Sequence, residues 1–129
     1  MRRGIVILVG AAILAIALWF LTIDRMFECE VTHHAALPSP DRSKQAVMFD
    51  VDCGVTTGFN TQVAITPMNA VFDREVTPAV LIMDGRWSLP IRWIDDMTLH
   101  IRIPAEERTY RKLTTTDDVT IKSTEDRLR

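Results

Sequence analysis

The sequence has few of the residues and motifs that mark several large protein classes. Only two of its 129 residues are cysteines, too few for a disulfide-dense, toxin-like scaffold. It contains no Cys-x-x-Cys motif, no Gly-x-Ser-x-Gly elbow and no glycine-rich phosphate-binding loop. The chain is also too short for a multidomain enzyme or a multi-span transporter. These absences leave a single small domain and a hydrophobic segment to be interpreted.

Charged residues are absent from residues 4–23, which read GIVILVGAAILAIALWFLTI. As a helix rising about 1.5 Å per residue, this stretch would reach roughly 30 Å, the thickness of the hydrocarbon core of a bilayer. Trp19 and Phe20 near its end suit the membrane interface, and Asp24 ends the apolar run. We therefore predict a transmembrane helix over residues 4–23, with the lipid bilayer as its partner.

The charges on the two sides of this segment predict its orientation. Arg2 and Arg3 precede it, whereas Arg25 on the far side is offset by Asp24 and Glu28. The positive-inside rule then places residues 1–3 in the cytoplasm and the rest of the chain outside it. The prediction is a single-pass cell-membrane protein whose C-terminal part lies on the periplasmic or cell-wall side.

A cleaved secretory signal is the alternative interpretation of this segment. Such a signal has an apolar region of about 7–15 residues followed by a small-x-small cleavage site. Here the apolar run is longer, and no small-residue site follows Leu21. An uncleaved signal anchor is therefore favoured, with a buried soluble helix as a further alternative.

The part of the chain after Ile23 is acidic. All 17 Asp and Glu lie there with 13 of the 15 Lys and Arg, which gives a net charge of −4. Its basic residues are scattered along the sequence, as Arg74, Arg86, Arg92 and Arg102 illustrate. Because an acidic domain is a poor polyanion binder, nucleic acid is not expected as a partner.

Both cysteines, Cys29 and Cys53, lie on the predicted exported side. An even number of cysteines in an oxidising compartment is most simply explained by one disulfide. Closing a loop of this length would stabilise the domain by roughly 3 kcal/mol in the chain-entropy model. A reactive thiol or a metal-ligand role is the alternative, although the spacing does not resemble a zinc ribbon.

Alternating apolar residues predict short β-strands after the anchor. Residues 47–53 and 61–66 alternate and are joined by a turn-rich connection, which predicts an antiparallel hairpin. Residues 91–93 and 99–103 predict a second hairpin. Further short strands are expected at residues 70–72, 79–83 and 119–121.

The predicted fold is thus an N-terminal transmembrane helix followed by a small, mainly antiparallel β domain. We place a linker with a proline turn at residues 24–43 and the β domain at residues 44–129. In the first strand, Val47, Phe49 and Val51 form an apolar face, and Asp50 lies on the opposite, half-acidic face.

Several motifs together resemble a signature of small uncharacterised bacterial proteins that are exported behind one apolar segment. They are Ser39-Pro40-Asp41, Lys44, Asp52-Cys53-Gly54 and Thr56-Thr57-Gly58-Phe59. In those proteins the first motif usually reads Ser-Pro-Asp-Gly-Lys, whereas Arg42 and Ser43 replace the glycine here. The resemblance implies a bacterial cell-envelope protein of the predicted fold, and it implies no activity.

The connection between the first two strands is the best candidate for a binding site. It contains two glycines, and its polar and aromatic side chains could present hydroxyls and an exposed ring to a ligand. The candidate binding residues are Asp52, Thr56, Thr57, Phe59 and Asn60. The alternative is that the glycines only enable the turn and the threonines suit strand ends.

The histidines and acidic pairs do not form a recognisable catalytic or metal site. His33 and His34 are adjacent, so on an extended chain their rings point to opposite sides, and His100 is alone. The pair Asp95-Asp96 lies in a predicted turn, where such side chains cap the local backbone. We expect no metal and no cofactor.

These observations predict a non-catalytic, membrane-tethered binding or assembly module. An exported sheet has edge strands that can recruit an envelope partner, or a second copy of the chain, by strand addition. The alternative is a small enzyme or a metal- or thiol-dependent envelope factor. It would use the loop at residues 54–61, His100 or the cysteines.

Overall fold

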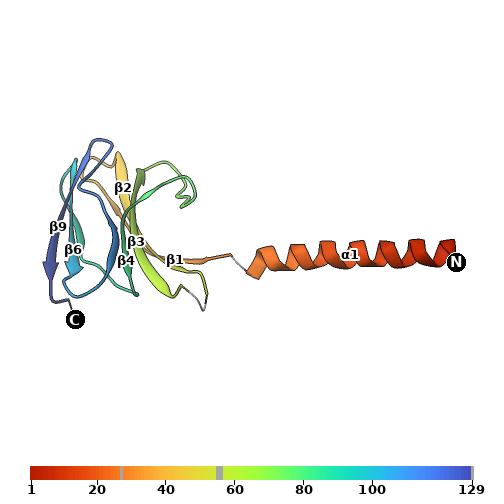
Figure 1. Cartoon of the computed structure of the whole chain (residues 1–129). Coiled ribbons are helices and arrows are strands. Elements are labelled where there is room, and N and C mark those ends of the chain that lie inside the picture. Colours follow the sequence, from red (N-terminus) through yellow and green to blue (C-terminus); the bar gives the residue numbers. More distant parts are fainter. Residues whose placement is uncertain (27, 55–56, 129) are drawn as a thin grey trace.

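The computed structural model describes residues 1–26, 28–54 and 57–128 (Figure 1). Within these residues, one helix, α1 (Arg2–Met26), precedes nine strands. The first five are β1 (Glu30–Pro38), β2 (Lys44–Asp52), β3 (Phe59–Pro67), β4 (Ala79–Asp84) and β5 (Ile91–Asp95). The others are β6 (Thr98–Pro104), β7 (Thr109–Lys112), β8 (Thr115–Thr116) and β9 (Val119–Asp126).

Helix α1 projects away from the strands (Figure 1). Its segment Arg2–Ile23 has a mean hydropathy of 2.8, and none of it is buried against the rest of the chain. This confirms that the chain has one N-terminal helix long and apolar enough to cross a membrane. A signal sequence near the N-terminus can also meet these criteria of length and composition.

The strands form two sheets. Strands β1, β2, β3 and β4 pair consecutively as an antiparallel meander, and β7 adds to β4. The second sheet has the order β5-β6-β9-β8, in which β6 and β9 run parallel and the other pairs are antiparallel. The prediction of a mainly antiparallel β domain is confirmed, and both predicted hairpins, β2–β3 and β5–β6, are present.

The main core lies between the two sheets, which face each other as a sandwich (Figure 1). On each strand alternate residues point inward, as Leu99, Ile101 and Ile103 of β6 do. They pack with residues of the other sheet, among them Met48 and Leu81. The apolar residues that predicted the strands therefore also hold the two sheets together.

A second, smaller core covers the outer face of β2. Val47, Phe49 and Val51 are buried there, and the segment at residues 68–78 places Phe72 over them. The rings of Phe49 and Phe72 have centroids 4.8 Å apart. The short strand expected at residues 70–72 is absent, because this segment packs through a side chain instead of a ladder.

Strand β2 is therefore buried on both faces, including the half-acidic face that carries Asp50. Asp50 shares a face with Met48, which packs in the main core, and Asp50 is only 2% exposed. The alternation alone did not show that the face of Asp50 is buried, although Ala46 and Met48 on that face are also apolar. The segment at residues 68–78, rather than solvent or the second sheet, covers the other face.

The linker expected at residues 24–43 contains strand β1. It pairs antiparallel with β2 in a register that places Val31 opposite Val51 and Ala36 opposite Val47. Its sequence alternates poorly because it is an edge strand and carries a β-bulge between His33 and Ala35. An edge strand needs few apolar residues, so the pattern-based prediction missed it.

The Ser-Pro-Asp segment forms the turn between β1 and β2, at the end of β2 opposite Cys53. Ser39 is buried; its hydroxyl lies 2.7 Å from Asp41 Oδ1 and accepts the Lys44 N–H at 3.2 Å. Arg42 adopts a left-handed conformation (φ 55°), where the resembled signature has glycine. The Asp41 N–H donates to Asp96 Oδ1 at 2.8 Å, which ties this turn to the β5–β6 hairpin of the other sheet.

We expect Asp41 to stabilise the fold only above acidic pH. The hydrogen bond from the Ser39 hydroxyl, and then those from the Ser43 N–H and hydroxyl, lower the pKa of Asp41 from 3.8 to about 2. A carboxyl with a lowered pKa contributes stability that is present above its unfolded pKa and is lost as the pH falls through its folded pKa. The melting temperature of Asp41→Asn should therefore lie below that of the wild type at pH 6, and the difference should shrink between pH 4 and pH 2. A difference that is constant across this range would contradict the prediction.

Candidate functional site

The loop predicted as a binding site follows β2 and precedes β3. Asp52 Oδ1 accepts the N–H of Gly54 at 2.9 Å, and Gly54 itself has a φ of 93°. The Asn60 side-chain oxygen accepts a hydrogen bond from the Gln62 amide at 2.7 Å. Two of the candidate polar groups thus serve the local backbone or a neighbour on the same strand.

The other candidate residues of this loop differ in what they can offer a ligand. Thr56 lies outside the described residues, and Thr57 is exposed. Phe59 is 40% exposed, and the guanidinium of Arg86 lies over its ring, 3.9 Å from the centroid. This cation–π contact links the predicted loop to the β4–β5 connection, a neighbour that the sequence did not indicate.

A polar cluster beside this loop was not predicted. It centres on Asp50, whose side chain is 3% exposed. Asp50 Oδ1 accepts the hydroxyl of Thr61 at 2.8 Å, while Oδ2 lies 2.6 Å from His34 Nε2 and 3.3 Å from Arg86 Nε. The buried carboxylate thus has partners from three other segments, which satisfies the requirement that a buried charge be paired and hydrogen-bonded.

Two local features of the fold assemble this cluster. The bulge in β1 inserts one extra residue, so that His34 turns toward Asp50 while His33 packs edge-on against Phe72 at 5.5 Å. The two histidine rings therefore have separate environments, as their adjacency predicted. Thr61 is the cross-strand partner of Asp50 in the β2–β3 register, which brings its hydroxyl to the carboxylate.

The order of the groups in this cluster does not suit nucleophilic catalysis. A hydroxyl nucleophile needs a histidine between itself and the carboxylate, whereas here Asp50 lies between Thr61 and His34. The Thr61 hydroxyl is fully buried, accepts the Trp87 N–H at 2.9 Å and lies 2.9 Å from the Gly85 carbonyl oxygen. The cluster is a clamp that joins β1, β2, β3 and the β4–β5 connection.

Removing the charge of Asp50 should therefore affect stability. Asp50→Asn replaces one acceptor oxygen by a donor and leaves His34, Arg86 or Thr61 without its partner, at a cost of about 1–3 kcal/mol in the free energy of unfolding. Urea denaturation followed by tryptophan fluorescence measures this loss. Asp52→Asn, two residues along the same strand, is the matched control and should change stability by less than about 0.5 kcal/mol. Equal losses in the two variants would show that the cluster is not a clamp.

The predicted Cys29–Cys53 pair is present as a disulfide. It lies one residue beyond the terminal cross-strand pair of β1 and β2, Glu30 and Asp52, so it closes that end of the ladder. The chain has two cysteines, and both are used in this bond. His100, named in the alternative prediction, lies on β6 of the other sheet and is hydrogen-bonded to Thr124 at 3.1 Å.

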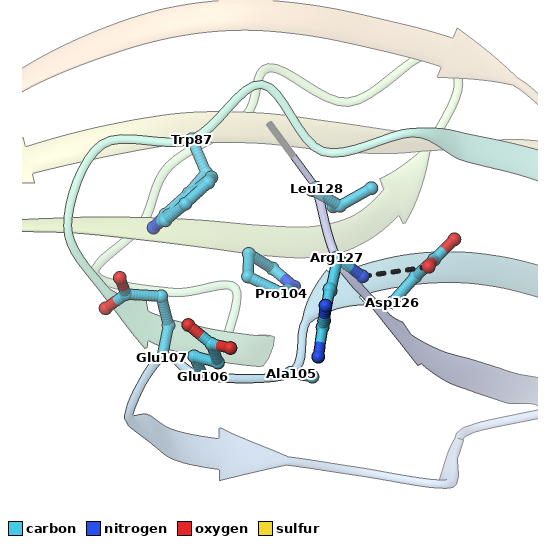
Figure 2. A pocket seen from close by; sticks show the side chains of 8 residues that line it. All are labelled: Trp87, Pro104, Ala105, Glu106, Glu107, Asp126, Arg127 and Leu128. Carbon is cyan, nitrogen blue, oxygen red and sulfur yellow. Dashed lines mark hydrogen bonds between the residues drawn. The ribbon is translucent and has the colours of Figure 1, made fainter.

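A pocket of about 380 Å³ is lined by Trp87, whose N–H binds Thr61 of the Asp50 cluster, and by residues near the chain terminus. Figure 2 shows the Trp87 indole on one side of it, the Glu106 and Glu107 carboxylates below, and Arg127 with Leu128 across from the indole. Among the described residues, no three His, Cys, Asp or Glu side chains are close enough together to hold a metal ion. The pocket is a surface recess whose charged lining residues are Glu106, Glu107, Asp126 and Arg127.

No family model, curated protein sequence or solved structure matches this chain.

The signal that would have located the Asp50 cluster is a single acidic residue inside an apolar strand. Asp50 interrupts the run from Ala46 to Val51, and such a residue either faces solvent or needs buried partners. The sequence did not show whether Asp50 faces solvent or has buried partners. Its partner His34 is positioned by the β1 bulge, and Arg86 comes from the distant β4–β5 connection.

Proposed function

We propose that this protein is a single-pass membrane protein of the bacterial cell envelope. Its N-terminus would be cytoplasmic, and its β-sandwich would act outside the cytoplasm as a binding module rather than an enzyme. One observation carries the proposal: an apolar helix that ends at Met26 is followed within three residues by a cysteine in a disulfide. Disulfides persist in oxidising compartments, so a chain with both features is best explained by export of the domain behind a membrane anchor.

The orientation can be tested with single added cysteines, because the native pair is closed. We expect a membrane-impermeant maleimide, applied to intact bacterial cells, to label Thr115→Cys on the sandwich. It should leave Arg3→Cys unlabelled until the cells are lysed. Labelling of Arg3→Cys and not of Thr115→Cys would overturn the proposed topology, and release of a helix-free fragment from the membrane would overturn the uncleaved anchor.

The proposed binding surface is the outer edge of β1. This strand is the longest of the four at sheet edges, with nine residues against five in β5, four in β7 and two in β8. Beyond its bulge, the indole N–H of Trp93 donates to the Leu37 carbonyl at 2.9 Å, so that part of the edge is partly occupied. Residues 30–33 remain as a short edge, held firmly by the disulfide beside them. A partner strand could add there through main-chain hydrogen bonds.

Site-specific photo-crosslinking in cells tests this surface. A photoreactive residue in place of Thr32, on β1, should form a discrete adduct whose mass distinguishes a second copy of this chain from another protein. The same residue in place of the exposed Tyr110, on the four-residue edge β7, is the matched control and should form none. An identical adduct pattern at the two positions, or no adduct at Thr32, would refute strand addition at β1.

A further inference from the structure

Cations that are far apart in the sequence gather on the outer face of the four-stranded sheet. The cross-strand register places Arg92 of β5 opposite His100 of β6, and His100 opposite Lys122 of β9, so the three form one row across the sheet. Arg102 follows His100 on the same face of β6. Neighbouring strands are about 4.8 Å apart, so this row spans roughly 10 Å.

Threonine hydroxyls surround this row. The register places Thr98 beside Thr120, and Thr120 beside Thr115, while Thr124 lies beside Arg102. These residues alternate with the buried residues of the same strands, so they belong to the outer face. None of the described residues of this face is a phenylalanine, tyrosine or tryptophan.

A recess of about 430 Å³ lies on this face, lined by Arg92, His100, Arg102, Pro90 and Ile91. The described residues that line it include two guanidinium groups and an imidazole, and none is acidic. The exported part of the chain has a net charge of −4, so a recess without an acidic lining residue stands out.

Two carboxylates border this basic row, and both are already engaged. Asp126 forms an ion pair with Arg102. Asp95 accepts the Met97 N–H at 2.9 Å. That bond, with further hydrogen bonds from Thr98 and the charge of Lys122, lowers the pKa of Asp95. Arg92 and Lys122 form no ion pair with any described residue. Arg102 would have to bind an incoming anion through the N–H groups that its ion pair with Asp126 leaves over.

The location of this face argues against the headgroups of the anchoring bilayer as its ligand. The four-stranded sheet is the layer of the sandwich farther from α1 (Figure 1). Its outer face is directed away from the helix, whereas β1, which continues from the helix, belongs to the other sheet.

We propose that this face binds a linear polymer of phosphate groups that carries no bases, with one phosphate in the recess between Arg92 and Arg102. Guanidinium groups bind phosphate through paired hydrogen bonds, and the exposed hydroxyls of Thr115 and Thr120 can supply further donors. A single-stranded nucleic acid would also present phosphates, but its binding normally includes base stacking on aromatic side chains, which this face does not offer. The inference extends the proposed binding role to a second surface and does not depend on the β1 edge.

The test uses the full-length protein in nanodiscs of zwitterionic lipid, with inorganic polyphosphate as the probe. We expect saturable binding that weakens about tenfold or more between 50 and 200 mM salt, as three phosphate contacts on a flexible chain would give. Single-stranded DNA of equal charge should bind at least tenfold more weakly. No saturable binding of polyphosphate at 50 mM salt, or equal affinity for the DNA, would overturn the proposal.

Matched variants assign the binding to the face. The double variant Arg92→Gln with Lys122→Gln should weaken polyphosphate binding at least tenfold while the melting temperature stays within about 2 °C of the wild type. Arg108→Gln with Arg111→Gln removes the same charge at another surface and should weaken it less than twofold. Equal losses in the two double variants would refute a specific face. Crosslinking at Thr32 tests the β1 edge, which is a different surface. The absence of a crosslink there would therefore not affect the polyphosphate measurement.

Discussion

Replacing Phe49 with alanine is expected to lower the free energy of unfolding by about 3–5 kcal/mol. The Phe49 side chain is fully buried between β2 and the segment at residues 68–78, where its ring packs against that of Phe72. Alanine would leave a cavity there, because the segment at residues 68–78 is fixed to β3 and β4 at its two ends. Urea denaturation of the full-length chain in detergent, followed by tryptophan fluorescence, measures the loss as a shift of the midpoint.

The matched control for this variant is Val71→Ala. Val71 belongs to the same covering segment but is 93% exposed, so its truncation should change stability by less than about 0.5 kcal/mol. A loss below about 1 kcal/mol for Phe49→Ala would mean that the second core contributes little and that the outer face of β2 is not covered in solution.

Loss of the disulfide is the second large effect we expect. Cys29→Ser with Cys53→Ser should lower the free energy of unfolding by about 3 kcal/mol in the chain-entropy model, because the unfolded chain is no longer closed into a loop. For a domain of this size, that corresponds to a fall in melting temperature of roughly 10–20 °C. The loss would come first at the end of β1 that follows the anchor, where the bond closes the β1–β2 ladder.

Reductant provides the control for this prediction. Dithiothreitol should lower the melting temperature of the wild type to that of the double serine variant and should leave the variant unchanged. The reductant should be added while the protein is unfolded, so that it can reach the bond. If the melting temperature of the wild type is then unchanged, the cysteines are not bonded in the isolated protein.

The candidate site could be predicted only in part from the sequence. The glycine-rich connection after β2 was proposed as a binding loop because of its composition, but the contact of Phe59 with Arg86 was not predicted. The burial of Asp50 was not predicted, because alternate residues on both faces of β2 are apolar and the alternation does not show which face is covered. Only the packing of the segment at residues 68–78 shows which face receives the second core.

The row of basic residues on the outer face of the four-stranded sheet could not be predicted from the sequence either. Arg92, His100 and Lys122 are separated by 8 and 22 residues, and a scan along the sequence finds them scattered in an acidic chain. They become neighbours through the pairing of β6 with both β5 and β9. Which charged residues become neighbours on a sheet depends on the pairing register of its strands. The register between distant strands cannot be predicted from a short stretch of sequence.

The sequence by itself determined the apolar helix, the disulfide pair and the two hairpins. Each depends on a local property: the length of an apolar run, the number of cysteines, or a period-two pattern on both sides of a short turn. Only the tertiary structure decided the division into two sheets, the strand β1 in the expected linker, the parallel pairing of β6 with β9, and the surroundings of Asp50. The physical reason is that these features join segments far apart in the chain, and such contacts are selected by the burial of the whole set of apolar faces together rather than by any one segment.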